Sequence, residues 1–275
     1  MKIAFCTCVQ LGKSCIEAVI SDGGRFDLFI SLHDNLAKNK SGRIFLDEIA
    51  SSNKVPLYKI RHINDIDVQE TLKKYSIDWL FIIGWSQIAS IDLLNAPKKG
   101  VIGAHPTLLP FGRGRAAVPW AILKGLKKTG VTFFKMDSGV DSGDIIEQCE
   151  VLIEPFETAT SLYSKINLAH AQLIKSVWPK LIKNNVTLVK QDETLATYWE
   201  GRSPSDGEVF KSMTLLEVDK MVRATTRPYP GAFIKLNEKK KLIIWSGTFQ
   251  SMDNSVVLEF ADGLYYSNDF EELNV

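Results

Sequence analysis

The chain has 275 residues, of which 45% are hydrophobic, so it can bury a full core as one large domain or as a large domain with a small companion. Its 33 Lys and Arg against 32 Asp and Glu give a formal net charge of +1, which lacks the basic field of non-specific nucleic-acid binding. No apolar run approaches about 18 residues and no signal peptide is evident, so we expect a soluble, cytoplasmic protein without nucleic-acid or membrane partners.

The first part of the chain alternates strand-like and helix-like segments. Short apolar runs predict strands at residues 2–7, 26–32, 55–60 and 78–83. Helices are predicted between them at 11–20, near 41–52 and at 67–75. Strands that alternate with helices pair in parallel through right-handed crossovers. The predicted fold is therefore α/β, a doubly wound, Rossmann-like domain with a mostly parallel sheet.

The second part begins with a further strand that starts at Val101 and ends at His105, and its texture changes after residue 185. Before that point we expect a helix-like segment at 116–126, a strand at 129–136 and an amphipathic helix at 158–184. After it, short β-rich pieces lie at 186–189, 232–236, 242–245 and 256–260. We therefore predict a catalytic domain at 1–185, a linker at 186–205 and a small β-rich carboxyl-terminal domain at 206–275.

Several common cofactor motifs are missing. Gly12-Lys-Ser lacks the partner glycine of a phosphate loop, and no Gly-x-Gly-x-x-Gly follows the first strand. The four cysteines include no Cys-x-x-Cys pair, so we interpret them as small buried residues. Asp137, Asp141 and Asp144 lack the spacing of a calcium loop. We predict no metal, nucleoside triphosphate or dinucleotide site.

His105 and Asp141 form the candidate acid/base pair. His105 ends one apolar strand, and Asp141 lies in the loop after the next. Open α/β sheets bind ligands at the carboxyl ends of their strands, where these side chains can meet. Taken singly, His105 can be a histidine satisfied at a strand end, and Asp141 a turn residue that caps backbone groups.

The residues from His105 to Gly114 read His-Pro-Thr-Leu-Leu-Pro-Phe-Gly-Arg-Gly. With Pro119-Trp-Ala-Ile, Thr129-Gly-Val-Thr and Met136-Asp-Ser-Gly-Val-Asp-Ser-Gly-Asp-Ile, this segment resembles the 10-formyltetrahydrofolate-dependent formyltransferase family. That family includes methionyl-tRNA, glycinamide ribonucleotide and nucleotide-sugar formyltransferases. The resemblance runs from about residue 75 to 155. A second patch, residues 201–207 and 223–233, resembles the region after the catalytic domain of the tRNA and sugar enzymes.

The resemblance implies roles for individual residues. The family's catalytic His falls on His105, its Asp on Asp141 and its Asn on Gly103. That Asn helps to hold the oxyanion on the formyl carbon, so another donor must replace it here or the chemistry is weakened. Histidine suits proton transfer from the amine because imidazole titrates near neutral pH. Asp141 would orient the ring and stabilise the imidazolium.

The resemblance also implies contacts with folate and substrate. The folate-binding candidates are Gly84, Trp85, Ile88, Thr107, Leu108, Leu109, Pro110 and Val140. The substrate-binding candidates are Arg113, Arg115, Arg227 and Tyr229. Arginine forks suit phosphate groups, although solvated surface arginines explain Arg113 and Arg115 as well. Trp85 can equally be a core aromatic, and the Pro-Tyr-Pro-Gly segment at Tyr229 can be a plain turn.

The acceptor that we expect is a nucleotide-linked amino sugar, with 10-formyltetrahydrofolate as the formyl donor. The tRNA enzymes of the family continue into a larger RNA-binding domain, whereas the end of this chain is short and acidic. Methionyl-tRNA formylation and a non-catalytic folate- or nucleotide-binding role, prompted by Gly103, are the alternatives. The resemblance also implies a possible homodimer.

Overall fold

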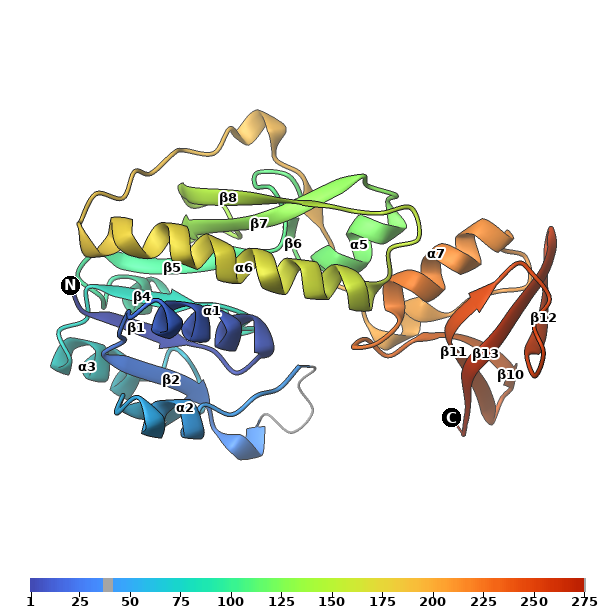
Figure 1. Cartoon of the computed structure of the whole chain (residues 1–275), viewed down its shortest axis with the longest axis horizontal. Helices are drawn as coiled ribbons and strands as arrows, with labels where there is room; N and C mark the ends of the chain where they lie inside the picture. Colours follow the sequence, from blue (N-terminus) through green and yellow to red (C-terminus); the bar gives the residue numbers. More distant parts are fainter. Residues whose placement is uncertain (37–41, 275) are drawn as a thin grey trace. The chain divides into compact units, whose positions relative to one another are not determined.

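The apolar runs of the first part of the chain form neighbouring strands of one sheet in the computed structural model, which describes residues 1–36 and 42–274 (Figure 1). The sheet has seven strands in the order β3-β2-β1-β4-β5-β7-β8. Strands β3, β2, β1, β4 and β5 pair in parallel, and β7 is antiparallel to β5. The bounds are β1 Ile3–Cys6, β2 Leu28–Leu32, β3 Leu57–Ile60, β4 Trp79–Ile82, β5 Gly100–His105, β7 Lys128–Lys135 and β8 Ile145–Leu152. The predicted doubly wound, mostly parallel sheet is confirmed.

Helices cover both faces of this sheet because its strands carry large apolar side chains on both faces. On one face, buried residues of α3 and α4, such as Val68 and Leu93, join one core cluster with strand residues. On the other face, Trp178 of α6 packs at 4.8 Å from Phe26, and Phe133 of β7 faces His170 of α6. The helices are α1 Gln10–Ser21, α2 Asp47–Ser52, α3 Ile66–Lys74, α4 Ile91–Leu94 and α6 Ala159–Ile182.

The structure differs from the prediction at several segments. The helix expected near 41–52 is α2, which begins at Asp47, and residue 41 lies outside the described residues. The strand expected at 186–189 is absent there, and only an isolated bridge joins Val189 to Ile145. Strand β8 was not predicted because its sequence, IIEQCEVL, mixes polar and apolar residues without a clean alternation. It lies at the sheet edge, where much of it is solvent-exposed.

The chain divides into two compact units. The first comprises Met1–Gly114, Gly130–Val151 and Lys165–Tyr198, and the second comprises Arg115–Thr129, Leu152–Ser164 and the chain from Trp199 on. Trp199 lies inside the segment predicted as a linker. Among the described residues, no helix has both the length and the apolarity that crossing a membrane requires.

A four-stranded antiparallel sheet forms the centre of the second unit. Its order is β10-β11-β13-β12, with β10 Ala232–Asn237, β11 Lys240–Thr248, β12 Val256–Phe260 and β13 Gly263–Asn274. Helix α7, Leu215–Thr225, packs Val218 and Val222 against this sheet, and α5, Ala117–Leu123, belongs to the same unit. The β-rich character matches the prediction, but α7 was missed. Its signal was the Thr214 and Glu217 capping box at its start.

Short elements complete the chain. They are the 3₁₀ helices η1 Asp34–Leu36, η2 Glu193–Leu195 and η3 Pro204–Gly207, and the paired two-residue strands β6 Arg113–Gly114 and β9 Tyr198–Trp199. The backbone N–H of Arg113 donates to Thr197 O at 2.9 Å. The N–H of Gly112 donates to the Thr197 hydroxyl at 2.8 Å. These bonds attach the loop after β5 to the segment before β9.

Candidate active site

His105 is the last residue of β5 and is buried. Its Nε2 lies 2.7 Å from Gly112 O, and its Nδ1 lies 3.4 Å from Asp141 Oδ2. A carbonyl oxygen can only accept, so Nε2 carries the proton in that hydrogen bond. The structure therefore brings together the two residues that the sequence predicted as a pair.

Asp141 is held on both its side chain and its backbone. Its Oδ2 accepts from the N–H of Gly114 at 2.9 Å. Its backbone oxygen accepts from Gln191 Nε2 at 2.8 Å, and the same amide donates to Gly143 O at 2.7 Å. Asp141 has a left-handed φ of 53°, which few non-glycine residues adopt without support. The loop is tight as well, since a Cβ at Gly143 would lie 1.8 Å from Lys135 O.

Every N–H group of the Arg113 guanidinium donates a hydrogen bond to another residue of the first unit. Its Nε and Nη2 donate to Gln191 Oε1 at 3.1 and 2.8 Å. Its Nη1 and Nη2 donate to the two carboxylate oxygens of Glu193 at 2.8 and 2.7 Å, and Nη1 also donates to the Tyr198 hydroxyl at 2.9 Å. These contacts use all five N–H groups of an arginine. The side chain is 0% exposed, and hydrogen bonding to Glu193 raises its pKa further.

This environment conflicts with the predicted substrate role of Arg113. A guanidinium that is buried and fully hydrogen-bonded has no N–H left for a phosphate of the substrate. Gln191 and Glu193, the main partners of Arg113, lie in the segment predicted as a linker, and no sequence motif marks them.

The loop from Pro106 to Pro110 is fixed by a buried threonine of β7. The Thr132 hydroxyl donates to Thr107 O at 2.7 Å and accepts from Leu109 N–H at 3.1 Å. Gln148 Nε2 donates to Leu109 O and to the Thr132 hydroxyl, both at 2.8 Å. Thr107 and Leu109 are predicted folate contacts, and Thr107 O, Leu109 N–H and Leu109 O are already hydrogen-bonded within the chain. Leu108 and Pro110, the other predicted folate contacts in this loop, are half-buried.

The remaining predicted folate residues lie on two loops of the first unit. Gly84 is exposed and directly follows the apolar run of β4, and Trp85 is half-buried with its indole N–H on Gln87 Oε1 at 3.2 Å. The Trp85 ring also packs against two core clusters, so it is in part a core aromatic. Ile88 and Val140 are 84% and 57% exposed.

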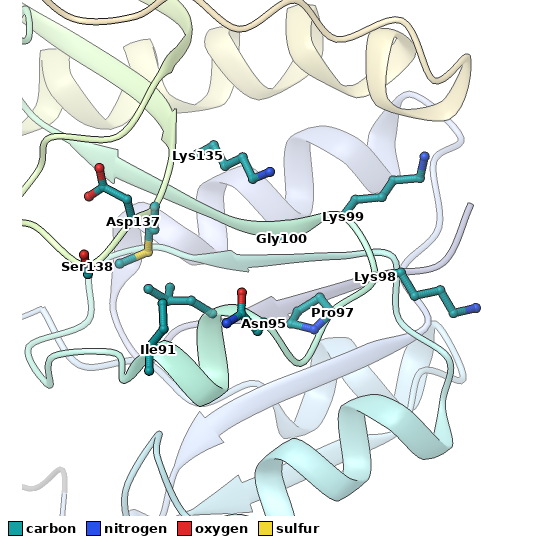
Figure 2. A pocket seen from close by; sticks show the side chains of 11 residues that line it. Ile91, Asn95, Pro97, Lys98, Lys99, Gly100, Lys135, Asp137 and Ser138 are labelled. Carbon is teal, nitrogen blue, oxygen red and sulfur yellow. The ribbon is translucent and has the colours of Figure 1, made fainter.

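A cavity of about 410 Å³ lies at the start of β5, beside the end of β7 and the residues that follow it (Figure 2). Ile91, Leu94 and Met136 supply apolar lining, and Asp137 and Ser138 begin the loop that leads to Asp141. Its full lining is Ile91, Leu94, Asn95, Pro97, Lys98, Lys99, Gly100, Lys135, Met136, Asp137 and Ser138. The sequence did not single out these residues as a binding site.

Gly103 faces a crowded part of the sheet. A Cβ at this position would lie 2.9 Å from Met136 Cγ and 3.0 Å from Phe134 Cζ. The side chains of these two residues occupy the space that a larger residue at 103 would need. The residue that would match the family Asn is therefore absent, and its place is filled by apolar atoms.

His170 of α6 is a second buried histidine behind the sheet. Its Nδ1 donates to Ile166 O at 2.8 Å, and its ring lies 6.1 Å from that of Phe133. Burial lowers its pKa from 6.5 to about 4, so the ring is neutral near pH 7. No role for His170 was predicted from the sequence.

The other predicted substrate residues belong to the second unit. Arg115 is exposed, and within residues 1–36 and 42–274 its guanidinium makes no hydrogen bond or ion pair. Arg227 is exposed, lies over the Trp245 ring at 4.3 Å and pairs with both carboxylate oxygens of Asp269 at 2.8 and 3.1 Å. Tyr229 is largely buried, which raises the pKa of its hydroxyl.

The described part of the chain contains no group of three His, Cys, Asp or Glu residues placed to hold a metal ion. Cys6, Cys8 and Cys15 are buried, and none of them forms a disulfide within the described residues. Burial raises the pKa of the Cys6 and Cys15 thiols, which keeps them protonated and unreactive.

Comparison with known proteins gives consistent matches. Residues 29–178 match the formyl transferase family model. The chain is 31% identical over 248 residues to the bifunctional polymyxin resistance protein ArnA of Wigglesworthia glossinidia brevipalpis, which covers 89% of this chain. The match spans only 37% of that relative's length.

Solved structures share the fold over nearly the whole chain. An N-formyltransferase from Helicobacter canadensis, in complex with folinic acid and dTDP-3-aminofucose, superposes with a TM-score of 0.74 at 18% identity, covering 97% of this chain and 98% of that one. Methionyl-tRNA formyltransferase from Clostridium thermocellum superposes with a TM-score of 0.66 at 20% identity, covering 99% and 98%. Similarity at this identity supports the fold.

Proposed function

The chain belongs to the formyl transferase family, and from this premise we propose that it transfers a formyl group from 10-formyltetrahydrofolate to the amine of a nucleotide-linked amino sugar. The observation that carries the proposal is the contact between His105 and Asp141 at the end of β5. Carboxyl ends of strands are where α/β sheets bind ligands. A histidine beside a carboxylate is suited to accept the proton that an acylated amine releases.

The hydrogen bonds of His105 suggest how the proton is held. In the neutral ring the proton is on Nε2, which donates to Gly112 O, and Nδ1 is the basic nitrogen next to Asp141. The amine attacks the formyl carbon and passes its proton to the imidazole. Both N–H groups of the resulting imidazolium then have acceptors, Gly112 O and Asp141 Oδ2. The C–N bond to tetrahydrofolate then breaks, and its leaving nitrogen takes that proton, which restores the neutral ring.

We place the formyl donor on the exposed apolar loops of the first unit. Ile88 and Val140 are large apolar residues that remain uncovered, and the family resemblance places both among the folate contacts. The cavity beside Asp137 and Ser138 has the volume of a small-molecule site, but it lies at the start of β5, whereas His105 is the last residue of that strand, so we do not place the donor there. Thr107 O and Leu109 N–H are hydrogen-bonded within the chain, so the predicted folate contacts of the Thr107–Pro110 loop would use its other groups.

The choice of acceptor rests on the relatives and on charge. The Helicobacter canadensis neighbour holds a dTDP-linked amino sugar, and the net charge of +1 offers no field for tRNA. Chain length, however, does not separate the two acceptor classes. The methionyl-tRNA formyltransferase structure aligns over 98% of its own chain, so the expected additional RNA-binding domain is not a general difference.

The test is release of tetrahydrofolate from 10-formyltetrahydrofolate in the presence of UDP- and dTDP-linked amino sugars. We expect turnover with at least one of them, and loss of roughly 100-fold or more of kcat in H105A and D141N, because general acid–base groups contribute that much. If both variants keep the wild-type rate within about threefold, His105 is not the proton acceptor and Asp141 does not assist it. Formylation of Met-tRNA with a salt-sensitive tRNA shift, and none with sugars, would favour the tRNA alternative.

A further inference from the structure

The segment Gly112–Gly114 contacts both members of the candidate catalytic pair through its backbone. Gly112 O accepts from His105 Nε2 at 2.7 Å, and Gly114 N–H donates to Asp141 Oδ2 at 2.9 Å. The residue between them, Arg113, sends its side chain the other way, into the protein. A shift of this backbone would therefore move partners of His105 and Asp141 together.

The side chain of Arg113 reaches the same aspartate by a second route. Its Nε and Nη2 donate to Gln191 Oε1, and Gln191 Nε2 donates to the backbone oxygens of Asp141 and Gly143. Gln191 is only 4% exposed, so water does not compete for these bonds. The contacts close a ring that runs from Arg113 through Gln191 and Asp141 to Gly114, next to Arg113 in the chain.

We propose that Arg113 and Gln191 are positioning residues that fix the Asp141 carboxylate against His105. This inference rests on the proposed formyl transfer for its role in turnover. Glu193 has a different part. It neutralises and anchors the buried guanidinium, its carboxylate is 60% exposed, and none of its contacts here reaches Asp141. Gln191 and Glu193, two of the three side-chain partners of Arg113, therefore separate positioning from anchoring.

The distinguishing experiment compares Q191E with E193Q, isosteric changes at two partners of one arginine. Q191E keeps an oxygen for Arg113 but loses the two N–H donors to Asp141 O and Gly143 O. We expect it to lower kcat by about 100-fold with both KM values within about threefold, since small misplacements of catalytic groups cost that much. E193Q should lower the melting temperature and leave kcat within about threefold.

A spectroscopic arm does not depend on turnover. The chain has four histidines, so the imidazole ¹⁵N signals can be assigned by the signal that H105Q removes. We expect the Nδ1 signal of His105 to shift in Q191E and to stay in place in E193Q. R113K, which has three N–H groups in place of five, provides a second variant should Q191E not fold, and it should shift the same signal.

A changed Nδ1 signal and a lower kcat in Q191E, with neither in E193Q, support the proposal. If both variants only lower the melting temperature and leave the Nδ1 signal in place, Gln191 has a merely structural role and the proposal is overturned. If the wild-type chain formylates no amino sugar, the proposed function fails, and the Nδ1 signals still decide whether Arg113 and Gln191 position the pair.

Discussion

Arg113 and Arg115 are separated by one glycine, yet their surroundings give them opposite properties. Arg113 is buried with every N–H used, whereas Arg115 is exposed, and its guanidinium makes no hydrogen bond or ion pair within the described residues. Their sequence context suggested the same phosphate-binding role for both. What separates them is the segment around Gln191 and Glu193, which is distant in the chain. A short motif cannot reveal such a partner, while His105 and Asp141 could be paired because each marks a strand end.

Gly103 gives a test at the level of a single side chain. We expect G103N to lower the free energy of unfolding by about 1 to 3 kcal/mol, the usual cost of overpacking, because its Cβ would meet Met136 and Phe134 at about 3 Å. Urea unfolding of G103N, M136A and the double variant measures this. The double variant should lose less than the sum of the single changes. A G103N chain as stable as the wild type would show that these side chains move aside freely.

Strand β7 shows how one element supports the candidate site. Its Thr132 lies opposite His105 in the sheet and is hydrogen-bonded to the loop that follows His105. Replacing its hydroxyl by a methyl group in T132V leaves Thr107 O and Leu109 N–H with fewer partners in a buried site. We expect a loss of about 1 to 3 kcal/mol in the free energy of unfolding.

Urea unfolding of T132V measures that loss, with T248V as the control. Thr248 lies on β11 of the second unit, is half-buried and accepts a single hydrogen bond from Gln250 N–H. We expect T248V to change the unfolding free energy by less than about 0.5 kcal/mol. Equal losses in the two variants would contradict a special role for the Thr132 hydroxyl.

Elements with a clean apolar pattern were predictable, and those with mixed patterns were not. The runs that became β1, β2, β4 and β5 are almost entirely buried, so their sequences are mainly apolar. Strand β8 lies at an edge and carries polar residues, and one of them, Gln148, turns out to fix the His105 loop. Gln148 reaches the site because β8 pairs with β7, and the local sequence pattern of β8 does not reveal that pairing.

At the scale of the whole molecule, formal charge is nearly balanced, so buried groups dominate the pH dependence that we can assign. His170 has its pKa lowered by burial to about 4, against 6.5 when unfolded. Between these values the unfolded chain binds a proton that the folded chain does not, so stability rises with pH across this window. Below it the folded ring is also protonated, and the full penalty persists.

Because stability rises with pH in this window, raising the pH from 5 to 7.5 should increase the free energy of unfolding of the wild type by about 2 kcal/mol more than that of H170M, which cannot bind the proton. Urea unfolding at a series of pH values measures the difference, and carboxylates that titrate in both proteins cancel in the comparison. Parallel stability curves for the two proteins would mean that His170 takes up its proton without unfolding. Phe133 and the middle of α6 would then have to admit water around the ring, against the burial seen here.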